Sequence, residues 1–235
     1  GGSIISVAGG RLKVGPESAG AMPGPACYRN NGPLTVTDAN VMLGVLQPDL
    51  FPALFGPGGD QPLDADAVRA KFAALGVELG CTAEQAAQGA LAIAVETMAQ
   101  AIARISIARG HDVTRYALAC FGGAGGQHAC KVADALGMTR VLIHPLAGVL
   151  SAFGIGLAEN RVVRQRSLNW PLGRDLAATA DALAAEARAV LLAQGEDVAS
   201  VRLSALVRYA GSDSGIELPL ASAEAMAAAF ADLQS

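Results

Sequence analysis

A glycine-rich loop lies between an apolar, strand-like run and a helix-like run within residues 116–137. Glycine permits positive φ and lets the backbone approach a ligand closely. In α/β proteins, the N–H groups of such a loop and of the first turn of the following helix can all point at one anion. The pattern therefore predicts a nucleotide phosphate site formed by Gly122, Gly123, Ala124, Gly125, Gly126 and Gln127.

The loop does not match the two best-known phosphate motifs. No Gly-Lys-Ser/Thr follows it, which excludes a Walker A loop. The dinucleotide-binding pattern G-x-G-x-x-G/A, started at Gly123, is matched at Gly125. Its last position, however, is His128 in place of glycine or alanine. A tight strand-to-helix turn that binds nothing remains the alternative.

His128 lies in the first turn of the expected helix. A histidine there can contact the phosphate or base of a nucleotide, or it can act as an acid or base. It can equally cap the helix or pack beneath the loop. We take His128 as a candidate catalytic residue and keep both readings open.

Three more polar residues are candidates. Asp38 follows an expected strand, where ligands collect in α/β sheets, so it can hold a divalent metal ion or orient water. The alternative for Asp38 is an ordinary helix N-cap. Glu17 and Ser18, between Gly15 and Gly20, are candidates for substrate contact, or are simply solvated.

Composition excludes several classes of protein. The chain has 235 residues, 52% hydrophobic content and a net charge of −4, which argues against nucleic acid binding. Its four cysteines form no CxxC pair, as is typical of a reduced protein, and no signal peptide is visible, so we expect a cytoplasmic location. The apolar stretch 83–109 contains Glu96 and Arg104, so we expect no membrane span.

Apolar periodicity, glycines and prolines predict the elements of the first part of the chain. Thr82 and Gln85 form a capping box for a long, mostly buried helix that ends at Gly110. The remaining expected elements are a hairpin over 3–14, an irregular loop over 15–33, a strand over 34–37 followed by a helix to 46, a helix over 65–75, strands over 116–121 and 140–144, and helices over 127–137 and 148–158.

After residue 160 the pattern changes. It predicts a strand over 161–168, a helix over 175–194, strands over 200–209 and 215–220, and a helix from Ser222. We therefore expect an α/β domain over 1–160 and the start of an α+β unit over 161–235. The chain opens on Gly1-Gly2-Ser3 without methionine and ends inside an expected helix, so we expect a piece of a longer polypeptide.

Several segments, in consistent order, resemble the hydantoinase A/5-oxoprolinase family. They are Val14–Ala21, Pro23–Tyr28, Thr35–Asn40 with Leu43-Gly44, Phe121–Ala129, Gly148–Gly156 and Arg208–Gly211. Three further segments look more like 5-oxoprolinase than like the N-methylhydantoinase or acetone carboxylase branches. They are Gly126–His128, Phe55–Pro57 and Gln61–Leu63.

The resemblance implies an ATP-dependent hydrolase of cyclic amides, which opens 5-oxo-L-proline to L-glutamate while ATP is cleaved to ADP and phosphate. It implies Mg²⁺ and a monovalent cation as cofactors. It also implies that the partners are a lactam substrate, the rest of the polypeptide or a hydantoinase B-like protein, and further copies in a homo-oligomer. A hydantoin hydrolase, an acetone carboxylase-type subunit and a non-catalytic assembly lobe are the alternatives.

The family also looks related to the actin/sugar-kinase/Hsp70 type of ATPase, which clamps ATP between two lobes. On that analogy, Gly122–Gly126 is the adenosine-side or second-lobe motif, and Gly1–Ser3 is the tail of another phosphate turn. The family's Asp-Gly-Gly-Thr loop is absent from these residues. We therefore expect ATP to be bound by the longer protein or an assembly.

Overall fold

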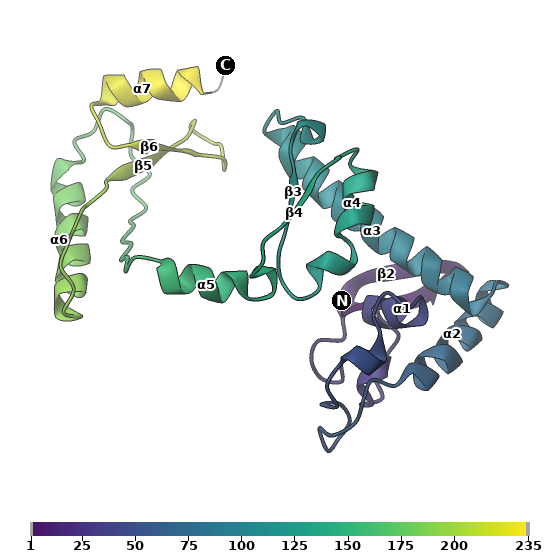
Figure 1. Ribbon diagram of the computed structural model, residues 1–235. Helices are drawn as coiled ribbons and strands as arrows, with labels where there is room; N and C mark the ends of the chain where they lie inside the picture. The colour runs from purple at the N-terminus through teal and green to yellow at the C-terminus, as the bar shows by residue number, and fades with distance from the viewer. Residues whose placement is uncertain (1, 234–235) are drawn as a thin grey trace. The chain divides into compact units, whose positions relative to one another are not determined.

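The computed structural model describes residues 2–233, so the expected phosphate turn over Gly1–Ser3 lies partly outside the described residues. Contacts divide the chain into two compact units, Gly1–Gly156 and Leu157–Ser235. The first unit, purple to teal in Figure 1, contains the following elements: β1 (Ser3–Ala8), β2 (Arg11–Ser18), α1 (Val36–Met42), α2 (Ala65–Leu79), α3 (Ala83–Ala108), β3 (Leu118–Cys120), α4 (Ala129–Ala135), β4 (Val141–Ile143) and α5 (Leu150–Leu157).

β1 and β2 form the expected antiparallel hairpin, with Val7 opposite Leu12. Gly9 and Gly10 have φ of 58° and 73°. Tight two-residue hairpin turns need two positive φ angles, which glycine adopts without strain. β2 continues to Ser18, beyond the predicted hairpin.

The predicted strand over 34–37 is wrong. Thr35 makes only an isolated bridge to Ile4, and α1 begins at Val36. Thr35 is the N-cap of α1, and Asp38 completes a capping box with it. Two side-chain caps so close together favour a helix start over continued strand pairing.

α3 is the central helix of the first unit, and Figure 1 shows it running from α2 to the β3–β4 pair. It packs against α1, α2, α4 and β2. The predicted capping box is present, since Thr82 N–H donates to Gln85 Oε1 at 2.9 Å and Gln85 N–H donates to Thr82 Oγ1 at 3.2 Å. The prediction that this helix is mostly buried is wrong for its last turns, because Ile105 and Ile107 are 61% and 71% exposed.

α3 is also long and apolar enough, by length and composition alone, to cross a membrane. The first half of this helix, however, packs inside its own unit. Ala86, Ala87, Ala90 and Leu91 are at most 2% exposed inside the unit, where they pack with α1 and α2. The apolar face of this half of α3 is therefore covered by the chain itself.

Thr82→Ala tests the start of this helix. The change removes the acceptor for Gln85 N–H and leaves α3 with an unpaired donor. We expect the free energy of unfolding to fall by about 1 kcal/mol. Urea unfolding of the 235-residue chain, followed by circular dichroism, measures it, with exposed Thr97→Ala as the control within the same helix. Equal effects of the two changes would contradict the capping role.

β3, α4 and β4 form a parallel βαβ unit, with Leu118, Ala119 and Cys120 opposite Val141, Leu142 and Ile143. Its core is shared with α3 and contains Val95, Ala99, Val132, Ala133, Leu136 and Met138. Alternating strands and helices place β3 and β4 side by side, as parallel pairing requires. The predicted α/β class is confirmed for this unit.

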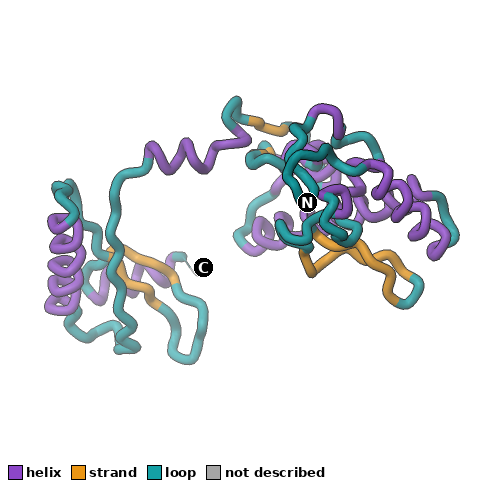
Figure 2. Tube along the Cα trace, turned by 90° about the horizontal axis from the view of Figure 1, so that it is seen from below, coloured by secondary structure: helices purple, strands orange, loops and turns teal. Residues whose placement is uncertain are grey.

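The second unit contains α6 (Ala177–Ala193), β5 (Ser204–Val207), β6 (Ile216–Pro219) and α7 (Ala223–Asp232). β5 and β6 pair antiparallel, and Leu218, Met226 and Phe230 form a small core. Figure 2 shows the two strands in orange beside helical segments. The predicted strand over 161–168 is wrong, because these residues form no ladder with any described segment and Val163 is 65% exposed.

Candidate functional site

The glycine loop follows β3 directly and leads into α4. Gly122 has φ of 88°, and its N–H donates to Ala147 O at 2.8 Å, which ties the loop to the segment after β4. A short 3₁₀ turn over Gly125–Gln127 follows, and α4 begins only at Ala129 rather than at the predicted residue 127.

The expectation that all loop N–H groups point at one anion is corrected by the structure. Three of these groups are bonded within the chain, because Gly122 N–H donates to Ala147 O, Gln127 N–H to Ala124 O and His128 N–H to Gly125 O. The N–H groups of Gly123, Ala124, Gly125 and Gly126 have no intramolecular partner in the described part of the chain. Four consecutive free donors therefore remain for an anion.

The glycines of the loop serve different purposes. A Cβ on Gly125 would lie 2.9 Å from Cys120 Sγ, so Gly125 is required by packing. A Cβ on Gly123 or Gly126 would meet nothing within 4 Å, and neither residue has positive φ. The backbone at these two positions is open to close approach by a ligand.

Asn40 of α1 is the residue of this site that sequence reasoning missed. Its side chain is fully buried, and its Nδ2 donates to Gln127 Oε1 at 2.7 Å across 87 residues of sequence. The same Nδ2 lies 3.4 Å from His128 Nε2. The available signal was a polar residue on the apolar side of a short helix, directly after Thr-Asp-Ala.

His128 is 7% exposed, and burial lowers the pKa of its imidazole below the usual 6.5. The positive charge of Lys131 acts in the same direction. Its Nδ1 and the Oδ1 of Asn40 are buried without a hydrogen-bond partner among the described residues. Unpaired buried polar atoms are uncommon in folded proteins and mark places where a ligand or water completes the structure.

The lowered pKa of His128 predicts how stability depends on pH. The unfolded state binds the proton more readily, so this contribution to stability is fully present above about pH 6.5 and is lost as the pH falls towards the folded pKa. We expect the melting temperature to fall less steeply between about pH 7.5 and about pH 5.5 in His128→Asn than in the unmodified chain. Parallel slopes would contradict a buried, neutral His128.

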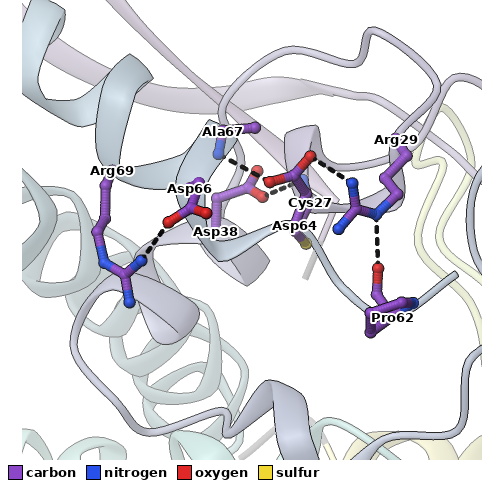
Figure 3. Close-up of polar contacts among 8 residues, drawn as sticks. All are labelled: Cys27, Arg29, Asp38, Pro62, Asp64, Asp66, Ala67 and Arg69. Carbon is purple, nitrogen blue, oxygen red and sulfur yellow. Dashed lines mark hydrogen bonds and ion pairs between the residues drawn. The ribbon is translucent and has the colours of Figure 1, made fainter.

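Asp38 is fully buried and accepts four hydrogen bonds. Oδ1 accepts from Cys27 N–H at 2.8 Å, and Oδ2 accepts from Ala26 N–H at 3.0 Å and from Thr35 N–H and Oγ1 at 2.8 and 2.9 Å. Asp38 thus holds the 26–28 turn against the start of α1, and Figure 3 shows it beside Cys27. Burial, followed by the charge of Asp38, raises the pKa of the Cys27 thiol far above its usual range.

A second polar cluster lies next to this turn (Figure 3). Arg29 donates to Pro62 O at 2.7 Å and pairs with Asp64 at 2.8 Å, and Arg69 pairs with Asp66 at 2.6 Å. These residues, together with Asp49, line a cavity of about 530 Å³. Both arginines are already paired with aspartates and Asp49 adds another acid, so this cavity does not suit a phosphate.

Glu17 and Ser18 are the remaining predicted site residues. Glu17 and Ser18 are exposed at the end of β2, where Ser18 Oγ accepts from Gly20 N–H at 3.2 Å. No hydrogen bond among the described residues joins them to the loop. Within residues 2–233, no group of three His, Cys, Asp or Glu side chains is placed to hold a metal ion.

Comparison with known proteins identifies the family of this chain. A family model described as "Hydantoinase/oxoprolinase" matches residues 1–164. The chain belongs to the hydantoinase/oxoprolinase family. The resemblance noted from the sequence is thereby confirmed.

Individual relatives cover most of the chain. "5-oxoprolinase PfmaA" of Pestalotiopsis fici is 45% identical over 228 residues, which is 92% of this chain and 18% of that protein. The ATP-dependent caprolactamase of Pseudomonas jessenii has a similar structure, with a TM-score of 0.67 and 32% identity over 99% of this chain and 35% of its own. The chain therefore spans about a fifth of the length of the curated relative.

A nucleotide-free acetone carboxylase has a TM-score of 0.65 and 23% identity, over 99% of this chain and 36% of its own. At that identity the likeness concerns the fold alone. The two structures confirm the mixed α/β fold of the hydantoinase type. The likeness to the actin/sugar-kinase/Hsp70 lobes stays a prediction.

Proposed function

We propose that the chain is part of an ATP-dependent enzyme that opens a cyclic amide, with 5-oxo-L-proline as substrate and L-glutamate as product. The observation that carries the proposal is 45% identity to a 5-oxoprolinase along 92% of the chain. The glycine loop supports it, because four consecutive free N–H donors and an open backbone at Gly123 and Gly126 suit a nucleotide.

The chemistry explains why such a reaction needs ATP. A five-membered lactam is an amide with a weakly electrophilic carbonyl and a poor leaving group. Transfer of the γ-phosphoryl group to the lactam oxygen breaks the bond to ADP, removes amide resonance and makes phosphate a leaving group. Water then adds to the ring carbon and the C–N bond opens, which leaves the new carboxyl group as an acyl phosphate. A second water hydrolyses this acyl phosphate, and glutamate and phosphate are released. The protein's part is positioning and charge stabilisation.

Within this chain we assign the nucleotide to Gly122–Gln127, with Gly123 and Ala124 N–H as donors to it. We propose that Glu17 and Ser18 face the substrate, supported by their exposure at the end of β2. Asp38 we propose as a structural residue, because both of its oxygens are already used. The described residues offer no resident metal site, so Mg²⁺ would enter with the ATP phosphates.

We further propose that the rest of a longer polypeptide, or a hydantoinase B-like partner, completes the enzyme in the cytoplasm, and that the complete enzyme is a homo-oligomer. The relative's fivefold greater length supports a larger protein. A requirement for a monovalent cation stays a prediction.

Phosphate release by the complete enzyme tests the proposal. We expect ATP cleavage to depend on 5-oxoproline and to yield glutamate in equal amount. Hydantoins, caprolactam, and a ketone with bicarbonate are assayed side by side, because relatives include an ATP-dependent caprolactamase. Faster turnover of one of these would reassign the substrate, and ATP binding without any turnover would favour a non-catalytic lobe.

A further inference from the structure

Asn40 joins α1 to the two residues that end the glycine loop. Its Nδ2 donates to Gln127 Oε1 and faces His128 Nε2 at 3.4 Å. All three side chains are wholly or partly buried, and the contact bridges 87 residues of sequence. An amide in this position controls which nitrogen of the histidine carries the proton.

The donor pattern selects one tautomer. Because an amide NH₂ only donates, the ring nitrogen that it faces is an acceptor, and the proton of neutral His128 lies on Nδ1. Burial favours the neutral ring, and the positive charge of Lys131 acts in the same direction. Nδ1–H is then a buried donor without a partner among the described residues.

We propose that Asn40 is a positioning residue that keeps His128 neutral and protonated on Nδ1, so that Nδ1–H donates to an acceptor atom of the nucleotide held by the loop, directly or through one water. This inference rests on the proposed nucleotide site. A ligand acceptor satisfies the unpaired donor, so nucleotide binding gains from the tautomer that Asn40 imposes.

The substitution Asn40→Asp should make nucleotide affinity depend on pH. The carboxylate accepts from Nε2–H, which moves the neutral ring's proton away from Nδ1, and it raises the pKa of the imidazole. We expect ADP·Mg²⁺ to bind about tenfold more weakly than to the unmodified enzyme at about pH 8.5. Affinity should return towards normal as the pH falls to about 6, because the imidazolium carries a proton on both nitrogens.

The experiment is calorimetric titration of the complete enzyme with ADP·Mg²⁺ across this pH range. The unmodified enzyme and the exposed control Asn31→Asp should show no such recovery. Asn40→Leu should bind weakly at every pH. Two results would overturn the inference. One is an unchanged ADP affinity of Asn40→Asp, which is expected if the side-chain amides of Asn40 and Gln127 both have the opposite orientation. The other is a loss of affinity that does not depend on pH.

A second pair of variants covers the case in which Asn40→Asp fails to fold. The amide of His128→Asn reaches the place of Nδ1, and that of His128→Gln reaches the place of Nε2. His128→Asn should therefore keep more nucleotide affinity than His128→Gln, and the reverse order would overturn the inference. If Gly123→Val binds ADP normally, the proposed nucleotide site fails; if only the Asn40 and His128 results fail, this inference alone falls.

Discussion

Asp38→Ala is expected to lower the free energy of unfolding by about 4 kcal/mol, because it leaves buried donors unpaired. The N–H groups of Ala26, Cys27 and Thr35 all donate to this carboxylate, and the side chain is fully buried. No other described acceptor is bonded to them. Urea unfolding of the 235-residue chain measures the loss.

Asp66→Ala is the matched control, since that aspartate lies in the first turn of α2 with a side chain that is 94% exposed. We expect it to change stability by less than about 0.5 kcal/mol. The experiment also decides between the two readings of Asp38. If Asp38→Ala folds as stably as the unmodified chain but abolishes turnover in the complete enzyme, Asp38 is catalytic or a metal ligand and our structural assignment is wrong.

Gly123→Val is expected to weaken ATP·Mg²⁺ binding to the complete enzyme by about 100-fold, since two charge-assisted hydrogen bonds are blocked. A branched side chain at this position covers the free N–H groups of Gly123 and Ala124. The fold should survive, because φ is not positive there and a Cβ meets nothing within 4 Å. Calorimetry measures the affinity, and circular dichroism checks the fold.

Gly173→Val provides the control. Gly173, in the second unit, also lacks positive φ and has open space around its Cβ position. The same change there should leave ATP affinity within about twofold. Normal binding by Gly123→Val would remove the nucleotide from the glycine loop and favour the reading of the loop as a simple turn.

Local signals in the sequence were sufficient for several elements. The Thr82–Gln85 capping box and Gly110 fixed both ends of α3, which runs from Ala83 to Ala108. Gly9-Gly10 fixed the hairpin turn. In each case the deciding interactions lie within a few residues, so a single sequence contains them.

Interactions between distant residues could not be predicted in this way. Asn40 meets Gln127 only because α1 and α4 both pack on α3. Asp38 looked like an N-cap or metal ligand, whereas two of its four hydrogen bonds come from residues 11 and 12 positions earlier. Residues 161–168 were expected to form a strand, but a strand needs a partner, and none lies beside them in the described part of the second unit.

Hydrogen exchange of the peptide covering Phe121–Cys130 in the complete enzyme, with and without saturating ADP·Mg²⁺, tests the central claim most directly. Gly123 and Ala124 have free N–H groups. These amides should exchange more slowly once they donate to the nucleotide. We predict that ADP·Mg²⁺ slows the exchange of this peptide in the unmodified enzyme and does not slow it in Gly123→Val. Unchanged exchange there, with protection appearing elsewhere, would contradict the account.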